Sequence, residues 1–246
     1  MKYCTGVVAA SLAIAPAAWA QFSPITQERS VQGSAQLTSG EESSGAQEAI
    51  DFSLFSGDVS RGVKGADSAS ASVSAIQNST ISADTITGSL SASGSVVTGS
   101  SFVVGQSDGF SAFLVIFSVG ADTQVNFAAS GSMKFLGINP DGEPADLYGV
   151  TRVSLVNADT FDPIAGFQFQ GGDYTNDAQF SGTLAAGTYA ILARAEFHGY
   201  SADLLGPPAR SGSGESSASF RLTVVPAPAS AVLFAAGLMG AARRRR

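Results

Sequence analysis

Small or apolar side chains alternate with polar ones through most of residues 21–225, and no segment there keeps the three-to-four-residue spacing of an amphipathic helix. Alternation with a period of two places successive side chains on opposite faces of a strand. Apolar segments recur about every 10 to 15 residues and are bounded by glycine, aspartate, asparagine or proline. The pattern predicts an all-β body, an antiparallel β-sandwich or a jelly-roll-like fold.

The alternation is strongest in residues 105–225, which are predicted to form the sandwich core. Phe110–Val119 is expected to be a buried strand, followed by a turn at residues 120–122 and a strand from Thr123 to Ala129. Later strands are expected over Gly149–Val156, Ile164–Phe169, Asp177–Leu184 and Ser217–Val225. Within Leu184–Ala195, a turn at Gly187 is expected to begin a further strand.

Residues 21–104 are rich in Ser, Gly, Ala and Thr and alternate less strongly. Within them, Ala69–Ile76 and Ser79–Ser93 place Val, Ile or Leu in phase, and no proline occurs between Ile25 and Asn139. We therefore expect weak strands in this region. A flexible low-complexity stalk is the competing interpretation, because the apolar positions carry little bulk.

The N-terminus has the three parts of a secretion signal. Lys2 supplies a positive charge, Val7–Ile14 is an apolar run, and Ala18 and Ala20 flank Trp19 in a small-x-small cleavage site. We expect residues 1–20 to form a signal helix. Signal peptidase would remove it and leave Gln21 as the first residue of an exported protein.

The C-terminal segment, residues 226–246, has the composition of a short membrane anchor. After Val225, two prolines disfavour strand pairing, and a 14-residue apolar run from Ala229 to Ala242 precedes four arginines. As a helix, this run would span about 21 Å, less than the roughly 30 Å hydrocarbon core. Arginine snorkelling and local thinning of the bilayer would offset part of the difference. A short transmembrane helix with its arginines in the cytoplasm is therefore expected.

This tail resembles the PEP-CTERM sorting signal of Gram-negative bacteria. The resemblance rests on the sorting motif and the arginine cluster: Val225, Pro226, Ala227, Pro228, Ser230, Arg243, Arg244, Arg245 and Arg246. It implies transient inner-membrane retention, processing by an exosortase, and association with exopolysaccharide and biofilm matrix. The family's usual glutamate is Ala227 in this chain. A plain C-terminal anchor without processing is the alternative.

Charge and residue counts exclude several kinds of site. The segment between the two terminal signals has 20 acidic and 8 basic residues, so it repels nucleic-acid phosphates, and we expect no nucleic-acid partner. Cys4 lies in the leader, and His198 is the only histidine. These counts argue against disulfides, thiol nucleophiles and histidine-rich zinc sites in the exported protein. No catalytic residues and no cofactor are predicted.

A few residues remain as ligand candidates. Oxygen ligands at Asn139, Asp141, Glu143 and Asp146 suit calcium, although the prolines among them also suit a rigid hairpin connection. Tyr174 and Tyr200 are expected in loops as sugar stackers, and His198 as a solvated loop residue.

Four carboxylates are candidates for a hydrolytic pair, but the sequence does not place any two of them together: Glu196, Asp173, Asp177 and Asp203.

These observations favour an exported, non-enzymatic protein of the cell envelope or extracellular matrix. It would be anchored in the inner membrane through its C-terminus and later placed at the cell surface. A carbohydrate- or calcium-binding sandwich on the same anchor is the alternative. A secreted hydrolase is the third interpretation, and the scarcity of candidate bases argues against it.

Overall fold

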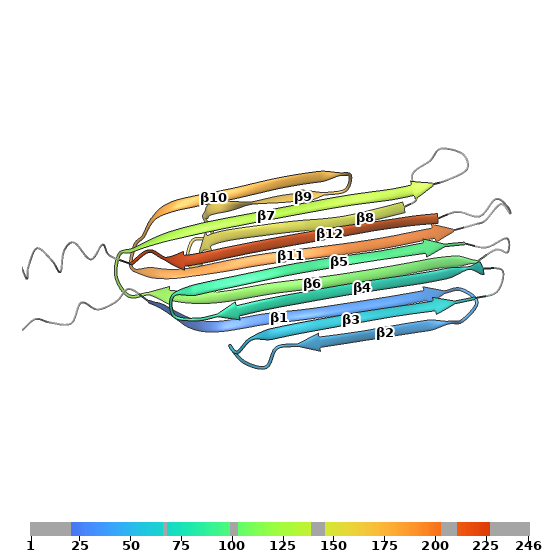
Figure 1. Ribbon diagram of the computed structural model, residues 1–246, viewed down its shortest axis with the longest axis horizontal. Helices are drawn as coiled ribbons and strands as arrows, with labels where there is room; N and C mark the ends of the chain where they lie inside the picture. The colour runs from blue at the N-terminus through green and yellow to red at the C-terminus, as the bar shows by residue number, and fades with distance from the viewer. Residues whose placement is uncertain (1–20, 66–67, 99–102, 139–145, 203–210, 227–246) are drawn as a thin grey trace, which may run out of the picture.

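The computed structural model describes residues 21–65, 68–98, 103–138, 146–202 and 211–226. In these ranges the chain forms β-strands joined by short connections (Figure 1). The strands are β1 (Phe22–Leu37), β2 (Glu42–Glu48), β3 (Phe55–Lys64), β4 (Ser70–Ile81), β5 (Thr85–Val97), β6 (Val104–Val119), β7 (Thr123–Ile138), β8 (Asp146–Asn157), β9 (Pro163–Gln170), β10 (Tyr174–Leu184), β11 (Gly187–Ala202) and β12 (Ser211–Val224).

Two six-stranded antiparallel sheets pack face to face as a sandwich, which confirms the predicted all-β class. Sheet A has the strand order β2-β1-β6-β11-β8-β9, and sheet B the order β10-β7-β12-β5-β4-β3. Strands from residues 21–104 and from residues 105–225 therefore pair within both sheets. All strands run close to the long axis of the molecule (Figure 1).

The strands expected from the alternation are present, and most are longer than predicted. The segment Ala69–Ile76 lies almost wholly in β4, so the weakly alternating region forms strands rather than a stalk. The expected strand Ser79–Ser93 is divided between β4 and β5 by a tight turn. In that turn, the Ser82 hydroxyl donates to Asp84 Oδ1 (2.7 Å) and accepts from the backbone N–H of Thr85 (3.1 Å). These local hydrogen bonds outweigh the continuous alternation.

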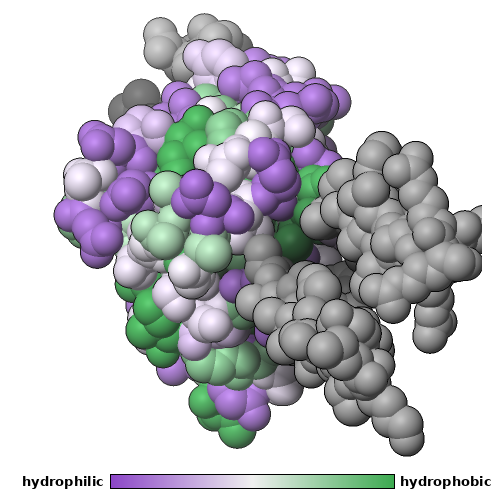
Figure 2. Space-filling view, turned by 90° about the vertical axis from the view of Figure 1, so that its left-hand side faces the viewer, coloured by the Kyte–Doolittle hydropathy of each residue, from purple (hydrophilic) through white to green (hydrophobic). Residues whose placement is uncertain are grey.

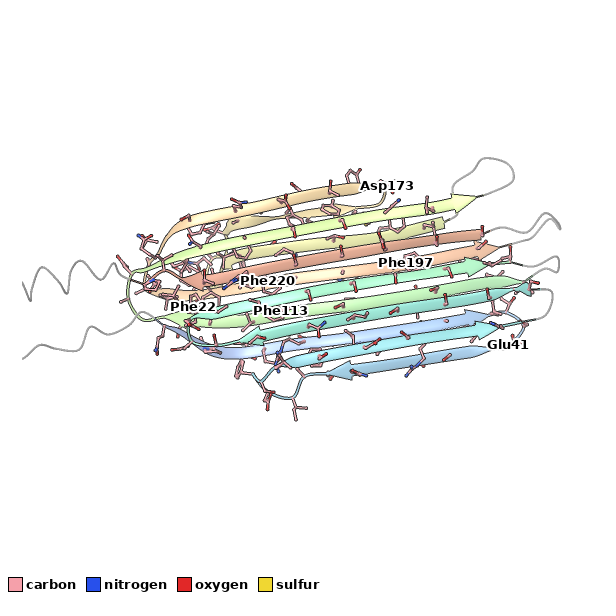
Figure 3. All side chains as sticks on the ribbon, in the orientation of Figure 1. Phe22, Glu41, Phe113, Asp173, Phe197 and Phe220 are labelled. Carbon is pink, nitrogen blue, oxygen red and sulfur yellow. The ribbon has the colours of Figure 1, made fainter. Side chains whose placement is uncertain are left out.

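The core is bulky at one end of the sandwich. Phe22, Phe113 and Phe220 lie toward the left-hand end in Figure 3, whereas Phe197 lies toward the other end. Phe113 and Phe220 approach from opposite sheets, with ring centroids 4.8 Å apart. Contacts between aromatic rings add to the free energy gained by burying their apolar surface.

Small residues allow the sheets to approach closely near the opposite end. A Cβ atom at Gly94 would lie 2.4 Å from a ring carbon of Phe197 and 2.6 Å from the Ser107 hydroxyl. Ser107 and Ser111 of β6 also donate hydrogen bonds to backbone carbonyls of β4 in the other sheet. The many serine and glycine residues therefore do not mark loops alone. In the strands, their small side chains allow the two sheets to pack closely.

Both ends of the described sandwich lie at the same pole. The Phe22 N–H donates to Ala83 O (2.6 Å), and the Val224 N–H donates to Asp84 O (2.9 Å), so β1 begins and β12 ends beside one turn (Figure 1). Viewed onto this pole, apolar side chains form separate patches among polar ones (Figure 2). Among the described residues, no helix has the length and apolar character needed to cross a bilayer.

Candidate functional site

A broad groove crosses the outer face of sheet A. It has a volume of about 1080 Å³ and is lined from β2, β1, β6 and β11. In β6, and in β11 from Leu192 to Tyr200, the even-numbered side chains point to this outer face. Their odd-numbered neighbours are buried between the sheets. Strand alternation therefore brings chemically different side chains from distant parts of the chain onto one surface.

Four charged side chains form a connected cluster in this groove. Asp108 on β6 lies directly opposite His198 on β11, and His198 Nδ1 is 2.8 Å from Asp108 Oδ1. The other ring nitrogen lies 3.9 Å from a carboxylate oxygen of Glu196, which is buried and forms an ion pair with Arg194. The Arg194 guanidinium also lies over the ring of Phe110, 4.9 Å from its centroid.

The two carboxylates keep the imidazole of His198 protonated. The hydrogen bond to Asp108 is the main cause and nearby Glu196 adds to it, and together they outweigh burial and raise the pKa of His198 to about 9. A protonated imidazole is a poor general base at neutral pH. The prediction that His198 is a solvated loop residue was wrong: it lies within β11 and bonds to β6.

We expect replacement of His198 by glutamine to remove a pH dependence of stability between about pH 6.5 and 9. The pKa of His198 is raised on folding, so its contribution is complete below its unfolded value of 6.5 and is lost as the pH rises through about 9. Because 41% of the side chain is exposed, solvent screening limits the effect to roughly 1 kcal/mol.

Urea unfolding of both proteins at pH 6, 7.5 and 9.5 measures this difference. His198 is the only histidine, so no other imidazole titrates in this window. Equal losses of stability in the wild type and H198Q would contradict the assignment.

The predicted sugar-stacking tyrosines lie in strands, not in loops. Tyr174 begins β10 in sheet B, where its ring centroid is 5.6 Å from that of Phe169. Tyr200 lies in β11 and points to the outer face of sheet A. Sequence analysis missed Tyr148, which lies on the same face in β8 with its ring centroid 5.7 Å from that of His198. Tyr148 falls one residue before the expected strand Gly149–Val156, so the predicted alternation does not include it.

The carboxylates considered for hydrolysis have separate positions. Glu196 faces the groove in sheet A, whereas Asp173 lies in the turn between β9 and β10 and accepts a hydrogen bond from the Phe135 N–H of β7. Asp177 is exposed on β10 in sheet B, and Asp203 lies outside the described residues. The carboxylate linked to Glu196 through His198 is Asp108, which sequence analysis did not identify.

The calcium candidates fall mostly outside the described residues. This applies to Asn139, Asp141 and Glu143, while Asp146 opens β8. Within the part of the chain that the structure describes, no three His, Cys, Asp or Glu residues are grouped as a metal site. The calcium site stays a prediction.

The sorting and cleavage residues lie at or beyond the edge of the described chain. Gln21 directly precedes β1, and Val225 donates a backbone hydrogen bond to Gln124 O (2.8 Å) before the exposed Pro226. The remaining predicted residues lie outside the described ranges: Ala18, Ala20, Ala227, Pro228, Ser230, Arg243, Arg244, Arg245 and Arg246.

Comparison with known proteins gives no family assignment. No protein-family model matches the chain, and no curated protein sequence matches it either. A proposal about function therefore rests on the signals at the two ends of the sequence and on the geometry of the sandwich.

Proposed function

We propose that this chain is an exported, non-enzymatic protein of the cell envelope or extracellular matrix, sorted through a C-terminal signal of the PEP-CTERM type. One structural observation carries the proposal: β1 begins and β12 ends at the same pole of the sandwich. A secretion signal and a C-terminal anchor would then both be joined to one end of the body, and neither strand needs to be displaced for processing.

The length of the strands supports a role in display. Strands of 16 residues, such as β6 and β11, extend about 50 Å at roughly 3.3 Å per residue. A body held by the segment after Val225 would present its opposite pole, and the outer faces of its sheets, away from the membrane. This arrangement suits a protein that contacts the cell surface or matrix.

The proposal includes two helices: a signal helix over residues 1–20 and a short transmembrane helix in residues 226–246. Signal peptidase would cut before Gln21, and an exosortase-type enzyme would act near Pro226-Ala227-Pro228. Arg243 to Arg246 would hold the intermediate in the inner membrane with its tip in the cytoplasm.

The charged cluster in the groove supports a non-enzymatic role. Its one imidazole is held protonated between two carboxylates, and Glu196 is occupied by Arg194. Neither arrangement supplies the free base that activates a serine or threonine nucleophile.

The intact mass of the mature protein from its host tests the sorting proposal. We expect an N-terminus at Gln21 and a C-terminus near Pro226. Replacing the four arginines, Arg243 to Arg246, with alanine should abolish membrane retention and prevent accurate processing. As a control, replacement of the exposed Arg221 with alanine should leave both ends of the mature protein unchanged. Mature protein at the cell surface that retains residues 1–20 or the arginine tail would contradict the proposal.

Carbohydrate binding is the second candidate function, because one face of sheet A combines an open polar groove with exposed aromatic rings. The described residues offer no comparable observation in favour of calcium binding.

A further inference from the structure

Two exposed tyrosines lie beside the groove on the outer face of sheet A. Tyr148 is 39% exposed and lies opposite His198 in the β8–β11 pairing, while Tyr200, 43% exposed, is the next residue on the same face of β11. A tyrosine ring has a hydroxyl at one end that donates and accepts hydrogen bonds, and it offers an apolar face. Exposed aromatic rings of this kind suit ligands that alternate apolar C–H surfaces with hydroxyl groups.

The adjoining groove supplies polar groups that the fold does not use. Gln32 and Ser34 of β1 line it, and within the described residues neither side chain makes a hydrogen bond. Ser34 lies directly opposite Asp108, which links this part of β1 to the His198 row. An amide and a hydroxyl each both donate and accept, as the hydroxyl groups of a sugar do.

The dimensions suit a chain of sugars rather than a single ring. The groove extends over four strands, about 14 Å at the usual spacing between neighbouring strands. The tyrosines lie on the β11–β8 side of it, which lengthens the combined surface beyond the groove itself. The groove is open to solvent rather than enclosed, so a polymer is not excluded by its length.

Charge narrows the class of ligand. In the groove, Asp108 is paired with His198, and Glu196 with Arg194, so these four charges largely compensate one another. Glu28 and Glu48 also line the groove, and neither has an ion-pair partner within the described residues. Their carboxylates would repel uronate, sulfate or phosphate groups.

We propose that the outer face of sheet A binds a non-acidic glycan chain. Tyr148 and Tyr200 stack on sugar rings, and Gln32 and Ser34 donate and accept hydrogen bonds in the groove. The Asp108–His198 pair and the Glu196–Arg194 pair form the surface between the two tyrosines and the two polar residues of β1. The inference gives the second candidate function a site and a ligand class, and it does not depend on export or tail processing.

A glycan array probed with the purified full chain tests the ligand class, followed by titration calorimetry with the best-bound oligosaccharide. We expect binding to neutral or amino-sugar chains and at least tenfold weaker binding to an alginate oligosaccharide of equal length. Y148A and Y200A should each weaken binding about tenfold, as should the double variant Q32A/S34A. In contrast, E28Q/E48Q should reduce the discrimination against alginate.

Tyr174→Ala is the matched control. Tyr174 is 50% exposed but lies on β10 in sheet B, so its replacement should leave glycan affinity unchanged. Circular dichroism verifies that each variant is folded. Absence of binding across the array, preference for acidic glycans, or equal affinity of Y148A, Y200A and Q32A/S34A with the wild type would each overturn the proposal. Mature-mass measurements would still test sorting separately.

Discussion

Replacing Arg29 with methionine should destabilise the sandwich by about 3 kcal/mol, although methionine retains an unbranched apolar stem. Arg29 points from β1 into the space between the sheets and is buried. Its guanidinium donates hydrogen bonds to Ser53 O (2.9 Å) and the Ser79 hydroxyl (3.2 Å), and also contacts Asp51 O.

The loss follows from the groups that Arg29 leaves behind. Two partly buried carbonyls of the connection between β2 and β3 would lose their donor. The buried Ser79 hydroxyl would also lose its partner, and an unsatisfied buried polar group costs about 1–3 kcal/mol. The guanidinium also lies 5.6 Å from the ring centroid of Phe55, and this contact would be lost. Arg29 therefore holds the β2–β3 connection against both sheets.

Urea unfolding followed by circular dichroism measures the change. R29K should recover only part of the stability, because an ammonium group lacks the planar fork that reaches several acceptors. The matched control R221M changes an exposed arginine on β12 and should stay within about 0.5 kcal/mol of the wild type. A loss below about 1 kcal/mol for R29M would show that the buried network contributes little.

Replacing Phe117 with alanine should cost about 3–5 kcal/mol. The Phe117 side chain is fully buried on β6. Its ring centroid lies 5.0 Å from that of Phe22 and 6.0 Å from that of Tyr189, on the two strands that flank β6 in sheet A. Alanine would leave a cavity between these rings. The β1–β6 and β6–β11 ladders restrict collapse of the surrounding strands, although the β1–β6 ladder has an irregularity between Pro24 and Thr26.

Phe161→Ala provides the comparison in the same unfolding experiment. Phe161 is 79% exposed in the turn between β8 and β9, so removal of its ring creates no buried cavity. Its positive φ of 60° is equally unfavourable for phenylalanine and alanine, so backbone strain is unchanged. Similar stability losses in F117A and F161A would contradict the position of Phe117 in the core.

The alternation of side chains was sufficient to predict most strands from β4 onward. Segments such as Phe110–Val119 carry bulky residues at every second position, and this local pattern decides which face of a strand is buried. It was less informative for β1, where the inward-facing series includes Arg29 and Gly33 beside Val31. From the sequence alone, a charged residue such as Arg29 is assigned to the solvent-facing side of a strand. Only its buried hydrogen-bond partners show that it points inward.

The candidate site was predicted only in fragments. His198 and Tyr200 were noticed as unusual residues, but both were expected in a loop, because the alternation weakens after Ala195. Asp108 was missed because its importance depends on pairing between β6 and β11. Tyr148 was missed because it lies one residue before the expected strand, and only the pairing of β8 with β11 brings it beside His198.

Local sequence patterns were enough to predict the strand-forming body and the signals for export and sorting, because both depend on contiguous residues. Side-chain phase and runs of apolar or basic residues act locally. The contact between His198 and Asp108, 90 residues apart, and the shared pole of the start of β1 and the end of β12 follow only from the three-dimensional fold. Strand order and register depend on how the two whole sheets pack. A given alternation pattern is compatible with many strand orders, so it does not select one of them.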